Sequence, residues 1–371
     1  MTGLYVHIPF CKSKCHYCDF NSFANCDEHI PPYFSALLKE AEAFAKRENE
    51  MVFDTLYFGG GTPSYVKADL LAKTIERFRL IFDLAKNTEV TVECNPGTID
   101  FTGFKTLKDI GVSRLSMGLQ SADDKMLKRL GRIHTFEEFK KCFFSARDAG
   151  FDNISLDLMY GLPDMTMNDW EYSLEKAMGF DPEHISTYAL KIEEGTPFSN
   201  MSLNLPDDDL FADMYEKSVE ILENSGYNRY EISNFAKPGC ESRHNLKYWH
   251  CDDFLGIGAG AYSCLKGKRF SNYSALADYI SSVSKSGFAI SETTEISDFE
   301  KMSEFVFLGL RCTKGISLSE FEIRFGKSIN EVFGPQIKKY YNLGFMVHKN
   351  NHLRLSDKGF FVSNIILADF V

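Results

Sequence analysis

The sequence predicts an α/β fold: a partial (β/α)6 barrel of the TIM type, followed by a C-terminal winged-helix-like α+β domain. Two observations support this prediction. From residue 4 to about residue 190, short β-rich apolar runs alternate with helical patterns, which is typical of strand and helix units around a parallel sheet. After residue 298 the pattern changes to a series of helices followed by a small hairpin.

Six apolar runs provide the predicted barrel strands, at residues 4–8, 55–58, 89–93, 114–118, 154–158 and 184–188. Between them, apolar residues recur at intervals of three and four in the predicted helices 32–47, 68–82, 136–149 and 167–178. Right-handed crossovers place such helices outside the sheet. The loops that follow the strands then gather at one mouth, where barrels of this kind hold their chemistry.

The C-terminal part is predicted as helices 301–310, 318–325 and 329–343 and a hairpin with strands 344–348 and 353–355. We therefore expect three regions: a barrel at 1–230, a connecting region at 231–297 and the winged-helix-like domain at 298–371. Residues 300–371 carry ten basic and seven acidic side chains. This small excess is weak support for nucleic-acid binding, so a structural or partner-docking role is preferred.

The composition excludes several classes of protein. The 371 residues are 44% hydrophobic and 25% charged, unlike collagenous, low-complexity or wholly disordered chains. A net charge of −11 argues against broad binding of a phosphate backbone. No apolar run approaches the roughly 18 residues of a membrane span, so we expect a soluble or at most peripheral protein. Ten cysteines are too sparse for a secreted disulfide scaffold, and the early strand leaves no room for a signal peptide, so we expect the reducing cytoplasm.

Three cysteines, Cys11, Cys15 and Cys18, follow the first predicted strand. A closed zinc site and a fully ligated [4Fe-4S] cluster both need four ligands, so three thiolates would leave one iron of a cluster open to a small chelating molecule. Two alternatives stay open at this point: a zinc site closed by a further residue, or thiols without metal. The candidates for the closing residue are His7, His16 and Cys26.

The Cys-x3-Cys-x2-Cys spacing, with Tyr17 directly before the last cysteine, resembles the radical S-adenosylmethionine (SAM) superfamily. The resemblance implies that Cys11, Cys15 and Cys18 hold a [4Fe-4S] cluster and that Tyr17 lies beside the cofactors. In that superfamily the amino and carboxylate groups of SAM chelate the open iron, and an electron from the cluster cleaves SAM to a 5′-deoxyadenosyl radical. The protein holds the reactive carbon and excludes water.

A glycine-rich turn, Phe58-Gly-Gly-Gly-Thr-Pro, closes the second predicted strand and lets a ligand approach the backbone closely. It resembles the Gly-Gly-Glu type motif of the superfamily. Four polar residues at or beyond successive strand ends offer two carboxylates, an amide and a guanidinium to SAM; they are Glu93, Gln120, Arg132 and Asp157. Each of them alone could instead be a salt-bridge or cap partner.

Together these residues match the coproporphyrinogen oxidase-like branch of the superfamily, and the resemblance runs over nearly the whole chain, including Gly256-Ile-Gly-Ala-Gly-Ala. It implies that SAM contacts Tyr5, Gly60, Gly61, Thr62, Glu93, Gln120, Arg132 and Asp157. By the same resemblance, we expect Arg132 on the carboxylate of SAM, and Gln120 and Asp157 on its ribose.

Two functions occur in this branch: oxygen-independent coproporphyrinogen III oxidase, which decarboxylates propionate side chains, and the HemW type of haem chaperone. Three features favour the chaperone. The oxidase pattern has a further cysteine two residues after the triplet, where this chain has Asp19-Phe20. The oxidase also has a longer segment before the cluster than the ten residues before Cys11. Finally, Arg243–Trp249 contains the His-Asn-x-x-Tyr-Trp motif that marks the HemW type.

The cofactor-binding candidates in that motif are His244, Tyr248 and Trp249. An imidazole or phenolate can ligate haem iron, and aromatic rings can cover a porphyrin face. The alternative is a surface loop with an aromatic anchor. His250, Cys240 and Cys251 could also reach the iron, so the choice of axial ligand stays open. For His7 the alternative is a core histidine. The remaining cysteines are interpreted as small buried hydrophobes; they are Cys26, Cys94, Cys142, Cys264 and Cys312.

The expected function is therefore that of a cytoplasmic haem chaperone with a radical SAM fold, which holds a [4Fe-4S] cluster, SAM and haem and delivers haem to respiratory proteins. No residue is assigned a catalytic role, and coproporphyrinogen III oxidase is the enzymatic alternative. The charge disfavours a third hypothesis, nucleic-acid modification. The expected partners are haem, haem-accepting clients that include membrane-surface proteins, and an electron donor for the cluster. A homodimer is a further candidate, and nucleic acid is not expected.

Overall fold

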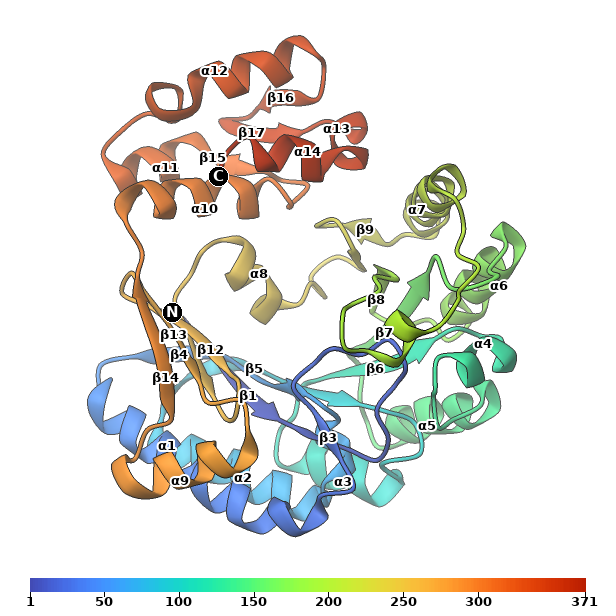
Figure 1. Cartoon of the computed structure of the whole chain (residues 1–371), viewed down its shortest axis with the longest axis vertical. Helices are drawn as coiled ribbons and strands as arrows, with labels where there is room; N and C mark the ends of the chain where they lie inside the picture. Colours follow the sequence, from blue (N-terminus) through green and yellow to red (C-terminus); the bar gives the residue numbers. More distant parts are fainter.

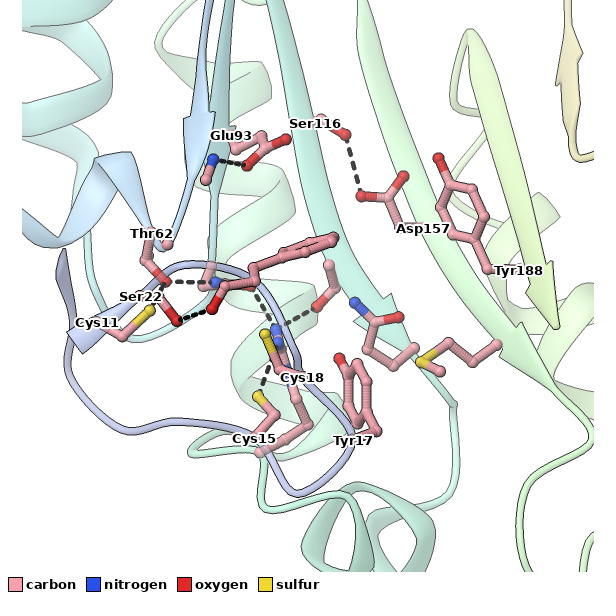
Figure 2. A pocket seen from close by; sticks show the side chains of 18 of the residues that line it. Cys11, Cys15, Tyr17, Cys18, Ser22, Thr62, Glu93, Ser116, Asp157 and Tyr188 are labelled. Atoms are coloured by element: carbon pink, nitrogen blue, oxygen red, sulfur yellow. Dashed lines mark hydrogen bonds between the residues drawn. The ribbon is translucent and has the colours of Figure 1, made fainter. Parts of the chain in front are cut away.

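Seven parallel strands form the centre of a twelve-stranded sheet in the computed structural model, which describes residues 1–371 (Figure 1). Their order across the sheet is β11 (Phe254–Ile257), β1 (Thr2–Ile8), β4 (Val52–Gly60), β5 (Asp83–Cys94), β6 (Arg114–Gln120), β7 (Ile154–Tyr160) and β8 (His184–Ala189). The last six contain the six predicted strands, which confirms the barrel prediction. Because the strands are parallel, their carboxyl ends meet at one mouth, and Figure 2 looks into the space there.

The helices that connect the strands cover the outer face of the sheet and one of its edges (Figure 1). They are α1 (Ile30–Arg47), α2 (Ala68–Ile81), α3 (Phe101–Asp109), α4 (Asp124–Arg129), α5 (Phe136–Asp148), α6 (Met167–Met178) and α7 (Asp208–Asn224). Capping boxes start α5, at Thr135 with Glu138, and α6, at Thr166 with Asp169, and satisfy their first backbone N–H groups. None of the helices of the chain combines the length and the apolar character that crossing a membrane requires.

Residues 228–297, which include the predicted connecting region 231–297, contribute to the same sheet on both sides of the parallel strands. Beyond β8 the sheet continues with β10 (Asn234–Ala236) and β9 (Asn228–Arg229), and beyond β11 with β12 (Tyr262–Leu265), β13 (Lys268–Asn272) and β14 (Ile290–Glu295). The region also forms α8 (Arg243–Trp249) and α9 (Leu276–Ser286). Its strands are short and partly joined by tight turns, which is why its sequence pattern resembles a connecting region.

The C-terminal domain has a hydrophobic core of its own. Its elements are α10 (Asp298–Gly309), β15 (Ile316–Ser317), α11 (Leu318–Phe325), α12 (Ile329–Asn342), β16 (Met346–Lys349), β17 (His352–Leu355), α13 (Asp357–Phe361) and α14 (Ser363–Ala368). The three helices and the hairpin agree with the predicted winged-helix-like arrangement, and the two short helices at the end are additional. The buried residues of this core all lie between Met302 and Phe370, so it packs separately from the core of the barrel.

Among the contacts between the C-terminal domain and the rest of the chain are those with α8 and the residues that follow it. Arg324 donates a hydrogen bond to the backbone oxygen of His250 at 3.0 Å, and the guanidinium of Arg311 lies 5.0 Å from the ring centroid of Trp249. Figure 1 shows α8 between the sheet and this domain. The C-terminal domain therefore covers one side of the helix that carries the His-Asn-x-x-Tyr-Trp motif.

A buried carboxyl group fastens the Gly256-Ile-Gly-Ala-Gly-Ala segment to α1. Glu40 is fully buried and accepts hydrogen bonds from Tyr279 (2.6 Å) and Asn272 (2.7 Å). The backbone N–H of Gly258 donates to it as well (3.0 Å). The same segment accepts a hydrogen bond of 3.0 Å from the amide of Asn21, which follows the cysteine triplet. This network thus helps to position the loop that carries the triplet.

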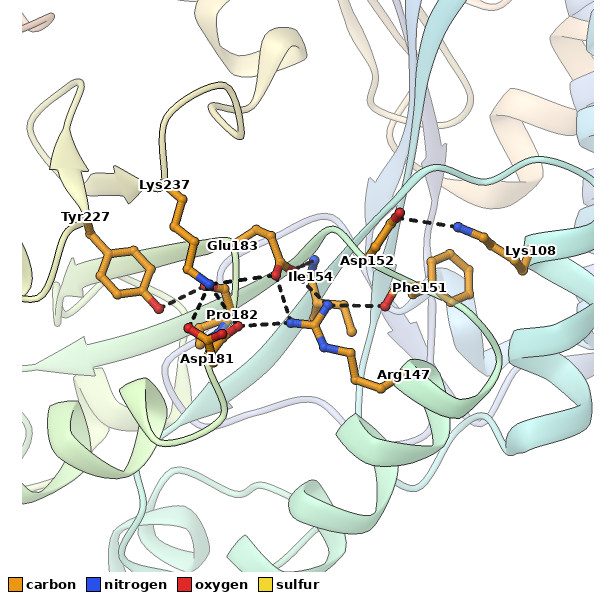
Figure 3. Close-up of polar contacts among 10 residues, drawn as sticks. All are labelled: Lys108, Arg147, Phe151, Asp152, Ile154, Asp181, Pro182, Glu183, Tyr227 and Lys237. Carbon is orange, nitrogen blue, oxygen red and sulfur yellow. Dashed lines mark hydrogen bonds and ion pairs between the residues drawn. The ribbon is translucent and has the colours of Figure 1, made fainter.

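A second polar cluster fastens the amino ends of β7 and β8 (Figure 3). Arg147 of α5 makes two hydrogen bonds to the carboxylate of Glu183, at 2.8 and 3.0 Å. Glu183 also accepts from the backbone N–H of Ile154 at 2.9 Å. Lys237 pairs with Asp181 at 2.7 Å. The cluster joins a helix to two strands, and its central pair is largely shielded from water.

Replacing Glu183 with glutamine is expected to lower the free energy of unfolding by about 2 kcal/mol, because Arg147 would keep only neutral acceptors in a shielded site. Urea unfolding followed by circular dichroism measures this change. The matched control is Asp109→Asn, which removes an exposed ion pair with Lys105 and should cost less than about 0.5 kcal/mol. Equal losses of stability in the two variants would contradict the larger contribution predicted for the pair of Arg147 and Glu183.

Burial raises the pKa of Glu40 to about 7 from an ordinary value of 4.5. Between these two values the folded chain binds the proton more tightly than the unfolded chain, so the free energy of unfolding should fall as the pH rises through this window. We expect a smaller fall in Glu40→Gln, because glutamine does not titrate. Urea unfolding at about pH 5 and pH 8 measures the difference, with Glu42→Gln on the same helix as the control. If the free energy of unfolding falls equally with pH in both variants, Glu40 is not the group responsible for the pH dependence.

Candidate functional site

A cavity of about 360 Å³ opens at the mouth of the barrel, lined by residues from the cysteine loop and from strands β4 to β8. In Figure 2 the three cysteines lie toward one end, and Glu93, Asp157 and Tyr188 lie toward the other. We call these two parts the cysteine end and the inner end of the cavity. The strand order places both ends in one cavity, although their residues come from distant parts of the chain.

The three thiols of the triplet line the cysteine end. Cys11 is buried, Cys15 and Cys18 are partly buried, and burial raises the pKa of the Cys11 and Cys18 thiols. A metal bound to these thiols would remove their protons and offset that effect. Nowhere in the chain do three His, Cys, Asp or Glu side chains converge on one position for a metal ion. Three thiols match the ligand set of an iron–sulfur cluster with one open iron, in which each thiolate binds a different iron.

The histidines that were candidates to close a zinc site have other partners. His7 bonds through Nε2 to the backbone oxygen of Asn21 (2.7 Å) and through Nδ1 to the hydroxyl of Tyr5 (2.9 Å). His16 bonds through Nδ1 to the backbone oxygen of Arg129 (2.9 Å). These bonds hold the two sides of the cysteine loop against β1 and α4. His7 is therefore a satisfied core histidine.

A chain of hydrogen bonds runs around the cysteine end from Cys15 to Cys11 (Figure 2). Arg132 donates through Nη1 to the sulfur of Cys15 (3.6 Å) and through Nη2 to the side-chain oxygen of Asn95. The amide of Asn95 donates to the hydroxyl of Thr62 (2.8 Å), which lies 3.5 Å from the sulfur of Cys11. The glycine-rich turn, the end of β5 and the cysteine loop are thus held together.

Most of the residues predicted to contact SAM line this one cavity. They are Tyr17, Gly60, Gly61, Thr62, Glu93, Gln120, Arg132 and Asp157. Tyr5 does not line it: its hydroxyl bonds to His7, and its ring stacks on Tyr57 with centroids 6.1 Å apart. Gly60 has a φ of +112°, and a Cβ at this position would overlap the ring of His7. Tyr5 and His7 therefore support the glycine turn from behind.

The carboxyl groups at the inner end are fixed by hydrogen bonds. Glu93 accepts from the hydroxyl of Tyr57 (2.9 Å) and from the backbone N–H of Gly60 (3.1 Å), and Asp157 accepts from Ser116 (3.0 Å). Burial raises the pKa of Glu93 to about 7 and also raises the pKa of Asp157. A ligand that brings a cation or hydroxyl donors would stabilise both carboxylates.

Gln120 reaches the cavity from a distorted strand end. It has a φ of +67°, in the left-handed region that is uncommon for residues other than glycine. The pairing of β6 with β7 also shifts register between Gly118 and Gln120. Such a bulge redirects a side chain, and here the side chain lines the cavity. Strain of this kind at a cavity is typical of residues that position a ligand.

The His-Asn-x-x-Tyr-Trp motif forms α8 rather than a surface loop. His244 is 1% exposed, and both of its ring nitrogens are bonded at 2.8 Å, Nδ1 to the hydroxyl of Thr55 and Nε2 to that of Tyr248. Burial lowers the pKa of His244 to about 3, so its imidazole is neutral. Trp249 packs against an arginine of the C-terminal domain. Within this motif, Asn245 is the residue that lines the cavity.

Several cavity residues were not singled out from the sequence. They are Asn95, Arg114, Ser116, His184, Ser186 and Tyr188. All but Asn95 occupy alternate positions on β6 and β8, where successive side chains point to opposite faces of the sheet. A search for polar residues at every second position of the apolar strands could have found them.

Comparisons with known proteins agree with this geometry. Residues 5–177 match the radical SAM superfamily, and residues 296–362 match the HemN C-terminal domain. The heme chaperone HemW of Bacillus subtilis is 36% identical, with 100% of this chain and 99% of the relative covered. HemW of Lactococcus lactis is 35% identical, with 99% and 96% covered.

The structure of the coproporphyrinogen III oxidase HemN from Escherichia coli superimposes with a TM-score of 0.88, covering 100% of this chain and 89% of that one. At 23% identity, this likeness establishes the fold alone. The full-length similarity to HemW relatives, at more than a third of positions, is what identifies the family. The chain belongs to the HemW family of radical SAM proteins.

Proposed function

We propose that the protein is a haem chaperone, which holds a [4Fe-4S] cluster and SAM in the barrel cavity, binds haem and delivers it to haem-dependent respiratory proteins. The observation that carries the proposal is the full-length similarity to relatives named heme chaperone. The cavity supports it, because three thiols and polar groups suited to SAM line one space. On this proposal the protein works in the cytoplasm with its client proteins and an electron donor.

Coproporphyrinogen III oxidase activity has less support. The likeness to HemN concerns the fold, and one fold serves many functions. Where the oxidase pattern has a further cysteine, this chain has Phe20, which is 63% exposed at the rim of the cavity. This chain therefore has no thiol at the position of the further cysteine in the oxidase pattern.

On this proposal the triplet Cys11, Cys15 and Cys18 holds the cluster, which supplies an electron-transfer centre with one iron open to SAM. Arg132, already fixed by Asn95, would bind the carboxylate of SAM. Gln120 and Asp157 would bind the ribose hydroxyls. The proposed SAM site lies beside the thiols, because both sets of residues line the same cavity.

The proposed haem contacts lie on α8. His244 and Tyr248 bond to each other, so iron ligation by either side chain requires this hydrogen bond to open. Trp249 would have to leave its packing against the C-terminal domain to cover a porphyrin face. Haem binding through this motif is therefore proposed to involve a movement of α8 relative to that domain.

Replacing Cys15 with serine should abolish the cluster, because two thiolates are too few to retain it. Iron and sulfide analysis after anaerobic reconstitution measures the loss, together with the electron paramagnetic resonance signal of the reduced protein and its change on adding SAM. The matched control is Cys26→Ser, which should retain iron and signal. Loss of the cluster in the Cys26 variant would indicate a fourth protein ligand and contradict the open iron.

Anaerobic titration with haem should produce a saturable Soret band in the parent protein. His244→Ala should weaken haem binding at least about tenfold, as expected for loss of a ligand or its positioning bonds. His352→Ala, on the hairpin of the C-terminal domain, is the control and should bind as the parent does. Thermal melting of each variant separates loss of binding from loss of folding. A parent protein without haem-dependent absorbance would refute the proposed function.

A further inference from the structure

Arg114 is a buried guanidinium at the inner end of the cavity for which the chain supplies no partner. It is 2% exposed, it lines the cavity, and its Nε is shielded without a hydrogen-bond partner. Arginine stays charged in proteins, and a buried charge without a partner is costly. A buried polar group without a hydrogen-bond partner is rare in folded proteins, so its presence calls for an explanation such as a bound ligand.

Two other arginines, Arg229 and Arg132, also have an Nε without a hydrogen-bond partner, but their terminal nitrogens are bonded within the chain. Arg229, also buried, pairs with Asp357 at 3.0 Å and lies 4.5 Å from the ring centroid of Phe360. Arg132, in the same cavity, donates to Asn95 and to the backbone oxygen of the residue four positions after Arg114. No hydrogen bond or ion pair of the chain involves the side chain of Arg114, so its terminal nitrogens, unlike those of Arg229 and Arg132, are free to bind a ligand.

The carboxyl groups of the cavity do not form a hydrogen bond or an ion pair with Arg114. Glu93 is bonded to Tyr57 and Gly60, and Asp157 is bonded to Ser116. Arg114 lowers the pKa of both carboxyl groups through its charge, but burial outweighs this effect and raises both values. The inner end thus holds a fixed cation beside carboxyl groups that are poor competitors for it.

The surroundings of Arg114 connect it to α8. His184 is neutral because burial lowers its pKa, and its nitrogens bond to Ser155 (2.7 Å) and to the hydroxyl of Tyr230 (2.8 Å). That hydroxyl accepts from the backbone N–H of Ser242, which caps α8, at 3.4 Å. These contacts bring the start of α8 to the inner end, and Asn245 of α8 lines the cavity there.

We propose that Arg114 and Asn245 form a carboxylate subsite that takes a propionate group of the haem cargo. The planar guanidinium matches the two oxygens of a carboxylate, and the amide adds a donor. The inference rests on the proposed function, and it gives the asparagine of the His-Asn-x-x-Tyr-Trp motif a role.

The carboxylate that binds to Arg114 could alternatively be that of SAM. The carboxylate of SAM is proposed to lie at the cysteine end beside Arg132, which donates to the backbone oxygen of Gly118 at 2.9 Å. Arg114 precedes Gly118 by four residues on β6, which is roughly 13 Å along a strand. Arg132 also donates to the sulfur of Cys15, whereas no hydrogen bond links Arg114 to the cysteine loop, so we assign the carboxylate of SAM to Arg132 and the subsite to a second molecule.

The test compares the affinity of the reconstituted, SAM-loaded protein for haem and for haem dimethyl ester, in which both propionates are esterified. The parent should prefer haem by about tenfold, the contribution of one charge-assisted pair. Arg114→Gln should remove this preference, and Arg114→Lys should retain part of it. Arg79→Gln, on the exposed face of α2, is the control and should prefer haem as the parent does. Soret titrations give each affinity.

Three results would overturn the assignment while leaving haem binding intact: equal affinity of the parent for the two porphyrins, a preference that persists in Arg114→Gln, or weaker SAM binding in that variant with an unchanged preference. The last result would assign Arg114 to SAM. If the parent binds neither porphyrin, the proposed function fails as well. Should Arg114→Gln not fold, Asn245→Ala replaces it, and a full tenfold preference in that variant overturns the subsite.

Discussion

The polar inner face of the parallel sheet is the constraint on which the rest of the structure depends. Apolar side chains on the outer face pack beneath the helices, while Glu93, Ser116, Asp157 and His184 point inward from neighbouring strands. Buried polar groups need hydrogen-bond partners. The chain supplies partners for these four residues but not for Arg114. The interior is therefore organised to receive ligands rather than to pack as an apolar core.

The cysteine loop has little regular structure, yet its thiols must keep a defined arrangement. Contacts with remote segments provide it: His16 bonds to the end of α4, and Asn21 bonds to the loop after β11. Arg132 adds a direct contact to Cys15. The positions of the thiols therefore depend on the assembled barrel. In the same way, Glu40 contributes from a distance, because it fixes the segment on which Asn21 rests.

The helix α8 links the two parts of the molecule. One side of it bonds into the barrel through His244 and Thr55, and its end packs beneath the C-terminal domain through Trp249 and His250. A side chain that satisfies both of its nitrogens within the protein is poorly placed to bind a metal at the same time. The motif therefore forms a structural joint between the cavity and the C-terminal domain.

Much of this architecture follows from local sequence. Alternating apolar runs located the six barrel strands, and the spacing of Cys11, Cys15 and Cys18 identified the cysteine loop before any contact was known. Tertiary structure alone determined the contacts of particular side chains. Tyr5 lies behind the glycine turn, His244 is satisfied within the barrel, and Arg114 is left without a partner.

The same division applies to residues 231–297, whose short strands find their places only beside β1 and β8. Periodicity and spacing are properties of neighbouring residues, so the chain alone encodes them. Whether a polar side chain is paired depends on segments far apart in sequence, such as Thr55 with His244, which become neighbours only when the sheet closes around its interior.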